Sequence, residues 1–381
     1  MNKPFEPSRP NFQKKHGRRP VRVSLETAAP PVFGKEGYER LRRPSFEGLF
    51  DPMTEANCVT GTFDAFNRRV NYLRISVTDR CNLRCTYCSD GEINHLHHDD
   101  ILRYEEIERV TKAAAALGVR HVRLSGGEPL VRPYLWNLIE LLTPIPGIED
   151  ISLTTNGTLL KEQATKLRSA GLKRINVSLD SLRPGRFERI TGGDKLGDVL
   201  EGIQEAHRVG LSPVKINMVV IPGVNDDEVE DFALMAKDEG WHVRFIEHMP
   251  FGGIGSTPSM TVAEIKEKIE SMVSDLWPCC LSGAGPASYF SFGEGQGTIG
   301  FIRPVSHRFC GQCNRLRLTA DGKLRPCLLN DLEIDIKSAL RNGAGISDLK
   351  DLLKQAIIAK PERHHLETAG IGGRQMRQIG G

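Results

Sequence analysis

From Asn71 onward, strand-like and helix-like runs alternate along the chain, and this alternation limits the possible folds more than any other feature. Six runs have the apolar character of strands: 72–77, 120–125, 150–155, 174–179, 214–220 and 242–247. Amphipathic patterns separate them, for example EEIERVTKAAAAL, in which Ile107, Val110 and Ala114 share one helical face. Strand and helix repeated in this way predict a parallel sheet with right-handed crossovers. We therefore expect an α/β fold built as a partial (β/α)6 barrel.

Residues able to do chemistry follow these strands, where a parallel barrel places its active site. The first strand leads into CNLRCTYC, the second into SGGEP (125–129) and the third into TTNG (154–157). The later strands carry or precede polar side chains and one methionine at Ser178, Asp180, Lys215, Asn217, Arg244, Glu247 and Met249. Each has an ordinary alternative explanation, such as an Asn-Gly turn or a tight glycine corner. Their shared position on one rim favours a common pocket.

The stretch CNLRCTYC places Cys81, Cys85 and Cys88 in a C-x3-C-x2-C spacing. Three thiolates so close in sequence predict a metal site. A structural zinc site needs a fourth ligand, whereas a cluster of iron and sulfur held by three thiolates leaves one iron open to a ligand from solution. The simpler alternative is a chance grouping of three unrelated cysteines.

A second cysteine group lies in HRFCGQCNRLRLTADGKLRPCL, where Cys310, Cys313 and Cys327 have the spacing C-x2-C-x13-C. Spacing alone favours zinc, with His307 or His248 as the fourth ligand. The first cysteine group favours instead a second iron–sulfur cluster, which we expect to face the barrel mouth.

Two arginines, Arg315 and Arg317, alternate in the segment NRLRLT that follows Cys313. In an extended strand they point to the same side. Two guanidinium groups suit a polyphosphate, because each can bind phosphate oxygens in a bidentate manner. A solvated basic edge is the alternative.

Composition narrows the class of protein. Six of the nine cysteines fall in the two groups, which indicates metal ligation in a reducing compartment, and hence a cytoplasmic protein, rather than a disulfide framework. No apolar run reaches the ~20 residues that span a bilayer, so we expect no membrane partner.

The positive charge of the chain lies in its first part. Residues 1–60 carry 11 Lys/Arg and 7 Asp/Glu, a net charge of +4; because the whole chain has a net charge of +3, the remaining 321 residues have 3 − 4 = −1. A near-neutral body argues against a nucleic-acid partner.

We divide the chain into three parts. Residues 1–60 hold 8 of the 22 prolines and form a basic extension that we expect to be disordered. A transit peptide is the alternative, although the extension lacks the required serine content and apolar face. The barrel occupies 61–250, and a C-terminal region with the second cysteine group and a Gly-Gly end occupies 251–381.

The first cysteine spacing, with Tyr87 just before its last cysteine, resembles the signature of the radical S-adenosylmethionine enzymes. In those enzymes a segment like SGGEP holds the methionine amino group. With the second cysteine group, RLR and the terminal IGG in the same order, residues 71–381 closely resemble the GTP 3′,8-cyclase family. Members of that family are lyases that catalyse the first step of molybdenum cofactor biosynthesis.

The resemblance implies a radical S-adenosylmethionine barrel with a C-terminal iron–sulfur extension, two 4Fe-4S clusters, S-adenosylmethionine as cofactor and GTP as substrate. The cluster on Cys81, Cys85 and Cys88 would cleave S-adenosylmethionine to a 5′-deoxyadenosyl radical. That radical would abstract the 3′ hydrogen of GTP, and the ribose radical would attack carbon 8 to give 3′,8-cyclo-7,8-dihydro-GTP. The second cluster, on the C-terminal cysteines, would hold the guanine.

The resemblance also implies individual contacts. S-adenosylmethionine would be bound by Tyr87, Gly127, Ser178 and Met249. GTP would be bound by Arg74, Arg123, Thr154, Lys215, Arg315, Leu316 and Arg317. The catalytic residues would be Arg315, Arg317, Gly380 and Gly381. The implied partners are a reductant such as flavodoxin or ferredoxin, a second copy of the chain, and cyclic pyranopterin monophosphate synthase downstream.

The chain departs from the family pattern at Ser89 and Asp90, where members commonly have Met-Pro. The next loop carries His95, His97 and His98, which we interpret as solvated rather than as ligands. Two alternatives stay open. A peptide-modifying maturase would keep both cysteine groups without needing RLR or the Gly-Gly end, and a zinc-bearing nucleic-acid-binding protein would need a clustered basic face.

Overall fold

The computed structural model describes residues 62–88, 95–249, 260–293, 297–364 and 374–380. The chain divides into two compact units, residues 1–57 and 58–381, and the first lies outside the described residues. The expectation of disorder for 1–60 therefore concerns residues that are not described.

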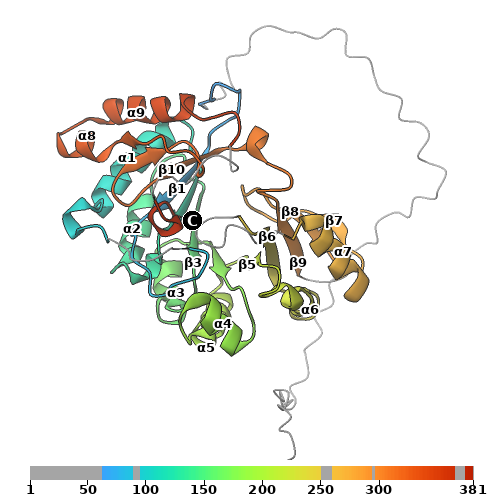
Figure 1. Ribbon diagram of the computed structural model, residues 1–381. Coiled ribbons are helices and arrows are strands. Elements are labelled where there is room, and N and C mark those ends of the chain that lie inside the picture. The colour runs from blue at the N-terminus through green and yellow to red at the C-terminus, as the bar shows by residue number, and fades with distance from the viewer. Residues whose placement is uncertain (1–61, 89–94, 250–259, 294–296, 365–373, 381) are drawn as a thin grey trace, which may run out of the picture. The chain divides into compact units, whose positions relative to one another are not determined.

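The predicted parallel strands form the centre of one curved sheet (Figure 1). They are β1 (Tyr72–Ser76), β2 (His121–Ser125), β3 (Asp150–Thr155), β4 (Arg174–Ser178), β5 (Val214–Val220) and β6 (His242–Glu247). Each pairs in parallel with the next along the chain. The prediction of an α/β fold with six consecutive parallel strands is confirmed.

Strands from the C-terminal region extend this sheet at both edges. Next to β1 lie β10 (Arg315–Leu318), β11 (Lys323–Arg325) and β12 (Ile334–Asp335). Next to β6 lie β9 (Thr298–Ile302), β8 (Ser288–Ser291) and β7 (Trp277–Cys279). Both β10 and β9 run parallel to their neighbours in the central sheet. The RLR segment therefore lies beside the strand that leads into the first cysteine group.

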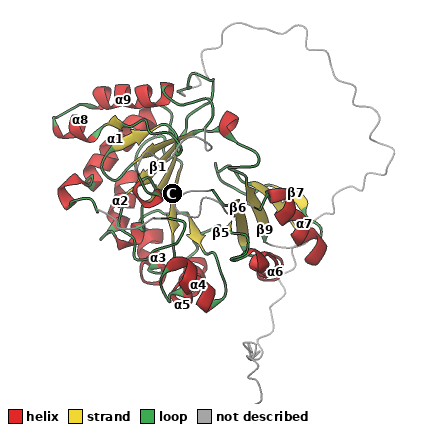
Figure 2. Ribbon diagram, viewed as in Figure 1, coloured by secondary structure: helices red, strands yellow, loops and turns green. Residues whose placement is uncertain are grey.

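Helices line the outside of the curved sheet (Figure 2). They are α1 (Tyr104–Ala116), α2 (Leu135–Leu142), α3 (Leu160–Ser169), α4 (Pro184–Thr191), α5 (Leu196–Arg208), α6 (Val229–Glu239), α7 (Val262–Met272), α8 (Lys337–Arg341) and α9 (Ile346–Ile358). In α1 the residues Ile107, Val110 and Ala114 are buried, as their spacing predicted. Within the described residues no helix has the length and apolar character needed to cross a membrane.

The two faces of the sheet differ in chemistry. In β1, Leu73 and Ile75 are fully buried in the apolar core, and Arg74 between them projects from the opposite face. Burying each such Leu or Ile contributes roughly 1.5–3 kcal/mol, so the apolar face stabilises the fold. The other face is free to carry polar side chains, and it holds the candidate site.

Candidate active site

The inner face of the sheet, opposite the helices, gathers positive charge. Arg74 of β1 is level with Arg123 of β2 on one side and with Arg317 of β10 on the other. The cations at these alternating positions are Arg74, Arg123, Arg174, Lys215, Arg244, Arg315 and Arg317. At matching positions of β1–β6, β9 and β10, Asp150 is the only carboxylate, and it pairs with Arg174.

Burial and mutual repulsion both act on these cations. Burial, with Arg317 and Arg123 nearby, lowers the pKa of Arg74 well below its ordinary value. Burial lowers the pKa of Arg244 and of Arg317 to about 10 in each case. Burial, with Arg244 and Arg174 adding repulsion, lowers the pKa of Lys215 to about 7. Buried cations without enough counter-charge favour an anion, so this inner face suits a ligand with several negative charges.

Polar atoms on the same inner face have no protein hydrogen-bond partner among the described residues. They are Thr154 Oγ1, Asn217 Oδ1, Arg244 Nε and Arg315 Nε. Buried polar groups are nearly always hydrogen-bonded, so these atoms indicate a place for ligand or water. Thr154 and Arg315 are two of the residues that the sequence predicted to bind GTP, and that prediction now rests on buried polar atoms in need of a partner.

The first cysteine group occupies the loop after β1. The amide of Cys88 donates to the Cys85 carbonyl at 3.0 Å, which closes a turn, and the amide of Leu83 lies 3.5 Å from Cys81 Sγ. Burial raises the pKa of all three thiols, and it raises the pKa of Cys88 to about 11. Negative charge on Cys88 or Cys81 would raise the pKa of Cys85 further. Since three neighbouring thiolates need a cation to coexist, the group fits a metal cluster.

The donor geometry bears on which metal the cysteines could hold. All eight cysteines in the described part of the chain are free thiols. Within that part, no three His, Cys, Asp or Glu side chains converge closely enough to hold a single metal ion. Each cysteine group offers three thiolates, which is the donor set of an iron–sulfur cluster with one open iron, whereas a structural zinc site takes four ligands.

The SGGEP segment packs against the loop that leads into Cys81. Gly127 donates its amide to the Thr78 carbonyl at 2.7 Å, and a Cβ at Gly127 would come within 2.3 Å of the Arg80 carbonyl. Glu128 accepts hydrogen bonds from Thr155 Oγ1 (2.6 Å), Asn156 N (2.6 Å) and Leu130 N (3.0 Å). Burial raises the pKa of Glu128 to about 7. One carboxylate thus joins the loops after β2 and β3.

The residues expected to contact S-adenosylmethionine lie along one rim. Tyr87 is in the loop after β1, Gly127 follows β2, Ser178 ends β4 and Met249 follows β6. The Tyr87 hydroxyl donates to Asp180 Oδ2 at 2.6 Å, and burial raises the pKa of Asp180 to about 6. The carboxyl ends of the parallel strands therefore bring the four residues to the side of the sheet that holds the first cysteine group.

The second cysteine group lies at the opposite end of the strands. Asn314, directly after Cys313, accepts the amide of Tyr72 at the beginning of β1. The expectation that this group faces the barrel mouth is therefore wrong: because β10 pairs in parallel with β1, the residues before β10 lie at the amino end. Burial opposes ionisation of Cys313, but Arg315 and Lys360 lower its pKa to about 7.

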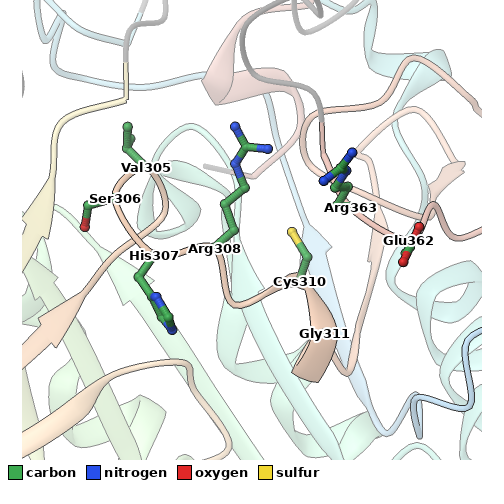
Figure 3. Close-up of a pocket in the computed structure, with 8 residues that line it drawn as sticks. All are labelled: Val305, Ser306, His307, Arg308, Cys310, Gly311, Glu362 and Arg363. Carbon is green, nitrogen blue, oxygen red and sulfur yellow. The ribbon is translucent and has the colours of Figure 1, made fainter.

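A cavity of about 520 Å³ opens beside this second group (Figure 3). Its lining consists of Val305, Ser306, His307, Arg308, Cys310, Gly311, Glu362 and Arg363. The Cys310 sulfur points toward the space between Arg308 and Arg363. His307 lines the cavity, but it joins no group of metal ligands among the described residues.

The C-terminal segment reaches back over the sheet. Arg317 Nη1 donates to the carbonyls of Gly380 (2.8 Å) and Ile379 (3.3 Å). Gly380 has a φ of +70°, and a Cβ there would come within 2.6 Å of Ser125 Oγ at the end of β2. Gly380 therefore lies between Arg317 and the end of β2, on the inner face of the sheet. Gly381 lies outside the described residues.

Several residues depart from the expected contacts or were missed. Among the residues expected to bind GTP, Leu316 projects into the apolar core, level with Leu73, so only its backbone can reach a ligand. Arg377 was not singled out, yet its backbone amide contacts Cys88 and its buried Nε and Nη2 lack partners among the described residues. Nothing in the sequence pattern could identify it, because it comes near Cys88 only through the fold.

The loop after the first cysteine group is described in part. Ser89 and Asp90 lie outside the described residues. His97 and His98 are exposed beside Asp99, and His95 lies 3.3 Å from Asp79 Oδ2. The exposure of His97 and His98 fits the interpretation of a solvated loop, whereas His95 contacts the buried carboxylate of Asp79.

Comparisons with known proteins bear on this site. Residues 75–236 match the model of the radical SAM superfamily, and residues 241–366 match the model named Molybdenum Cofactor Synthesis C. A GTP 3′,8-cyclase of Pelotomaculum thermopropionicum is 50% identical over 323 residues, which are 84% of this chain and 99% of that protein. The GTP 3′,8-cyclase of Thermodesulfovibrio yellowstonii is 48% identical, with the same coverage of both chains.

Among solved structures, Streptococcus suis SuiB bound to precursor peptide SuiA has a TM-score of 0.57 to this chain. It is 14% identical, and the match covers 81% of this chain and 71% of that one. At this identity the likeness concerns the fold alone.

Proposed function

The chain belongs to the GTP 3′,8-cyclase family of radical S-adenosylmethionine enzymes, and from this membership we propose that it converts GTP to 3′,8-cyclo-7,8-dihydro-GTP on the inner face of its sheet. That reaction begins molybdenum cofactor biosynthesis, and the enzyme is a lyase. The observation that carries the choice of site is the row of buried cations between the two cysteine groups. From Tyr72 to Ser76, at about 3.3 Å per residue, this face extends about 13 Å.

The substrate spans this length. The guanine lies at the amino end of β10, next to the second cysteine group, and the ribose lies toward the carboxyl rim. The triphosphate binds to Arg74, Arg123, Lys215, Arg315 and Arg317. Thr154 Oγ1, which has no partner in the described structure, donates a hydrogen bond to the ligand, and Leu316 offers its backbone. Guanidinium groups suit this task because they stay charged and bind oxygens in pairs.

The two cysteine groups fit 4Fe-4S clusters, the first on Cys81, Cys85 and Cys88 and the second on Cys310, Cys313 and Cys327. The first cluster, together with bound S-adenosylmethionine, would supply the 5′-deoxyadenosyl radical that abstracts the 3′ hydrogen of GTP, and the second cluster would hold the guanine.

The protein orients the reacting groups and keeps water away. Tyr87, Gly127, Ser178 and Met249 bind S-adenosylmethionine along the rim. Gly380 closes the inner face from the side of β1 and β2, and the bonds from Arg317 to the carbonyls of Ile379 and Gly380 support this assignment. The catalytic role of the Gly-Gly end extends to Gly381. Tight enclosure matters, because a radical left open to solvent reacts with the wrong partner.

The proposal extends to partners and location. A low-potential reductant such as flavodoxin or ferredoxin supplies the electron, and cyclic pyranopterin monophosphate synthase takes the product. The chain forms a homodimer and works in the cytoplasm. The free thiols of the described cysteines support a reducing compartment.

A peptide-modifying maturase is the competing candidate, since SuiB shares the fold. Its 14% identity carries no argument about substrate, whereas relatives at 48–50% identity are cyclases. A peptide also has no need for a row of buried cations.

The test is an anaerobic incubation of reconstituted protein with GTP, S-adenosylmethionine and dithionite, followed by mass spectrometry. We expect 5′-deoxyadenosine together with an isomer of GTP. Replacing Arg317 with Ala removes charged hydrogen bonds worth about 1.5–3 kcal/mol, so KM for GTP should rise roughly 10- to 100-fold. The exposed Arg168, replaced in the same way, is the control and should leave KM unchanged.

The other outcomes separate the parts of the proposal. If 5′-deoxyadenosine forms while GTP stays intact, the radical chemistry stands and the substrate assignment fails. If neither product forms in protein that holds both clusters, the proposed function is wrong.

A further inference from the structure

Two buried cations, Lys360 and Arg68, lie behind the second cysteine group and take no part in the contacts proposed for GTP. Lys360 follows α9 and is 3% exposed. Its Nζ lies 2.8 Å from the Arg315 carbonyl, 2.9 Å from the Pro326 carbonyl and 3.7 Å from Cys313 Sγ. An ammonium group has three N–H donors, and here it has three acceptors. The surroundings of Lys360 therefore match a charged side chain.

These acceptors belong to the segments that carry the cysteines. Arg315 comes two residues after Cys313, and Pro326 directly precedes Cys327. Lys360 thus connects the two ends of the β10–β11 hairpin and contacts one of its sulfur atoms directly.

Arg68 connects the remaining cysteine to the same support. Its Nη1 donates to the carbonyls of Cys310 and Glu362, both at 2.8 Å, and its Nη2 donates to the Pro361 carbonyl at 2.7 Å. Asp64 pairs with the same guanidinium. Arg68 reaches only backbone oxygens near the cysteines, whereas Lys360 reaches a sulfur.

We propose that Lys360 is a positioning residue for the second cluster, which holds Cys313 in place and raises the reduction potential of the cluster through an N–H···S hydrogen bond. The inference rests on the proposed function, because it takes Cys310, Cys313 and Cys327 as cluster ligands. Reduction adds a negative charge to the cluster. A donor and a buried positive charge beside a ligand sulfur stabilise that reduced state more than the oxidised one.

The substitutions separate charge from hydrogen bonding. Lys360→Met keeps the length of the side chain and removes both the charge and the donors. Lys360→Arg keeps the charge, and Lys360→Gln keeps a donor without charge. Lys354→Met is the matched control, because Lys354 lies in α9, six residues before Lys360, and is half exposed and paired with Asp351.

The experiment is a dithionite titration of the reconstituted holoenzyme followed by electron paramagnetic resonance, with iron and sulfide counted for every variant. The two clusters are told apart by their ligands. The signal that shifts when GTP is added, and not when S-adenosylmethionine is added, is assigned to the second cluster. In Lys360→Met we expect the equilibrium constant for reduction of that cluster to fall about tenfold, which for one electron is a shift of about 59 mV to more negative potential. Lys360→Arg and Lys354→Met should keep the original potential.

An unchanged potential in Lys360→Met with full iron content would overturn the inference. If Lys360→Met does not load its second cluster, the reduction potential of that cluster in Lys360→Gln decides. A potential more negative than that of the unaltered protein supports the role of the charge, and an unchanged potential rejects it. If the unaltered protein has no signal that responds to GTP and holds the iron of a single cluster, then the proposed second cluster itself is wrong, whatever Lys360 does.

Discussion

Lys215 shows how one side chain reports the electrostatics of the inner face. It is 3% exposed, its Nζ donates to the Ser282 carbonyl at 2.5 Å, and it lies 5.1 Å from the centre of the Tyr289 ring. Burial, and then repulsion from Arg244 and Arg174, lowers its pKa to about 7. Near neutral pH a large fraction of this lysine is therefore unprotonated. A bound anion would raise its pKa, so that the lysine takes up a proton again.

We predict that GTP binding weakens as pH rises above about 7, by up to tenfold in Kd per pH unit, because the free protein must then take up a proton to bind. The stability of the ligand-free protein should change in the opposite direction. Between pH 7 and about 10 the unfolded chain holds the lysine proton that the folded chain has lost, so the free energy of unfolding rises with pH. Calorimetric titrations in buffers of different ionisation enthalpy measure the proton uptake.

Lys215→Arg is the control for this pH dependence, since a guanidinium stays charged over the whole range. It should bind GTP with little dependence on pH. If its affinity falls with pH as steeply as that of the unaltered protein, a group other than Lys215 is responsible.

At the scale of loops and strands, SGGEP acts as a spacer between two loops. Since a Cβ on Gly127 would lie 2.3 Å from the Arg80 carbonyl, Gly127→Ala must displace the backbone that leads into Cys81. We predict that this variant loses iron from the first cluster and no longer binds S-adenosylmethionine, while the second cluster stays loaded. Iron analysis and the spectral response to S-adenosylmethionine measure this. Gly197→Ala, in α5 with nothing within 4 Å of the added Cβ, should change neither; full loading of Gly127→Ala would contradict the prediction.

The order and direction of the central strands could be predicted from the sequence because each pairs with the next along the chain. The position of the second cysteine group could not, since the pairing of β10 with β1 joins Arg315 to Tyr72 across more than half of the chain. Alternation predicted that Arg315 and Arg317 share a face, but it cannot name the neighbouring strand. For the same reason Lys360 and Arg377 gave no signal: each approaches a cysteine only through tertiary packing.

At the scale of the whole chain, the catalytic unit begins after the basic extension. The compact unit starts at Cys58, and the curated relatives match 84% of the chain. We predict that removing residues 1–57 leaves the melting temperature and the rate of product formation nearly unchanged. In the shortened chain, Arg68→Ala should lower stability by about 3–5 kcal/mol, because it leaves Asp64 buried without its partner. A shortened chain that loses activity while Arg68 is intact would contradict this prediction.

Contacts at two places hold the C-terminal segment against the sheet. Arg374 binds Asp321 in the β10–β11 turn (Nη2–Oδ2, 2.8 Å) and Glu333 before β12, and Arg317 holds Gly380 over the ends of β1 and β2. Arg374→Ala should therefore free the segment without touching either cluster.

The expected result of Arg374→Ala is wasteful turnover. S-adenosylmethionine is still cleaved, but the ratio of cyclised product to 5′-deoxyadenosine falls severalfold, because an open inner face lets the radical react elsewhere. Asp321→Asn should lower the ratio less, because Glu333 still binds Arg374. Adding it to Arg374→Ala should change little, since the interaction with Asp321 is already lost in that variant. A normal ratio in Arg374→Ala, in protein whose C-terminal end has become sensitive to carboxypeptidase, would mean that the segment can leave the inner face without exposing the radical.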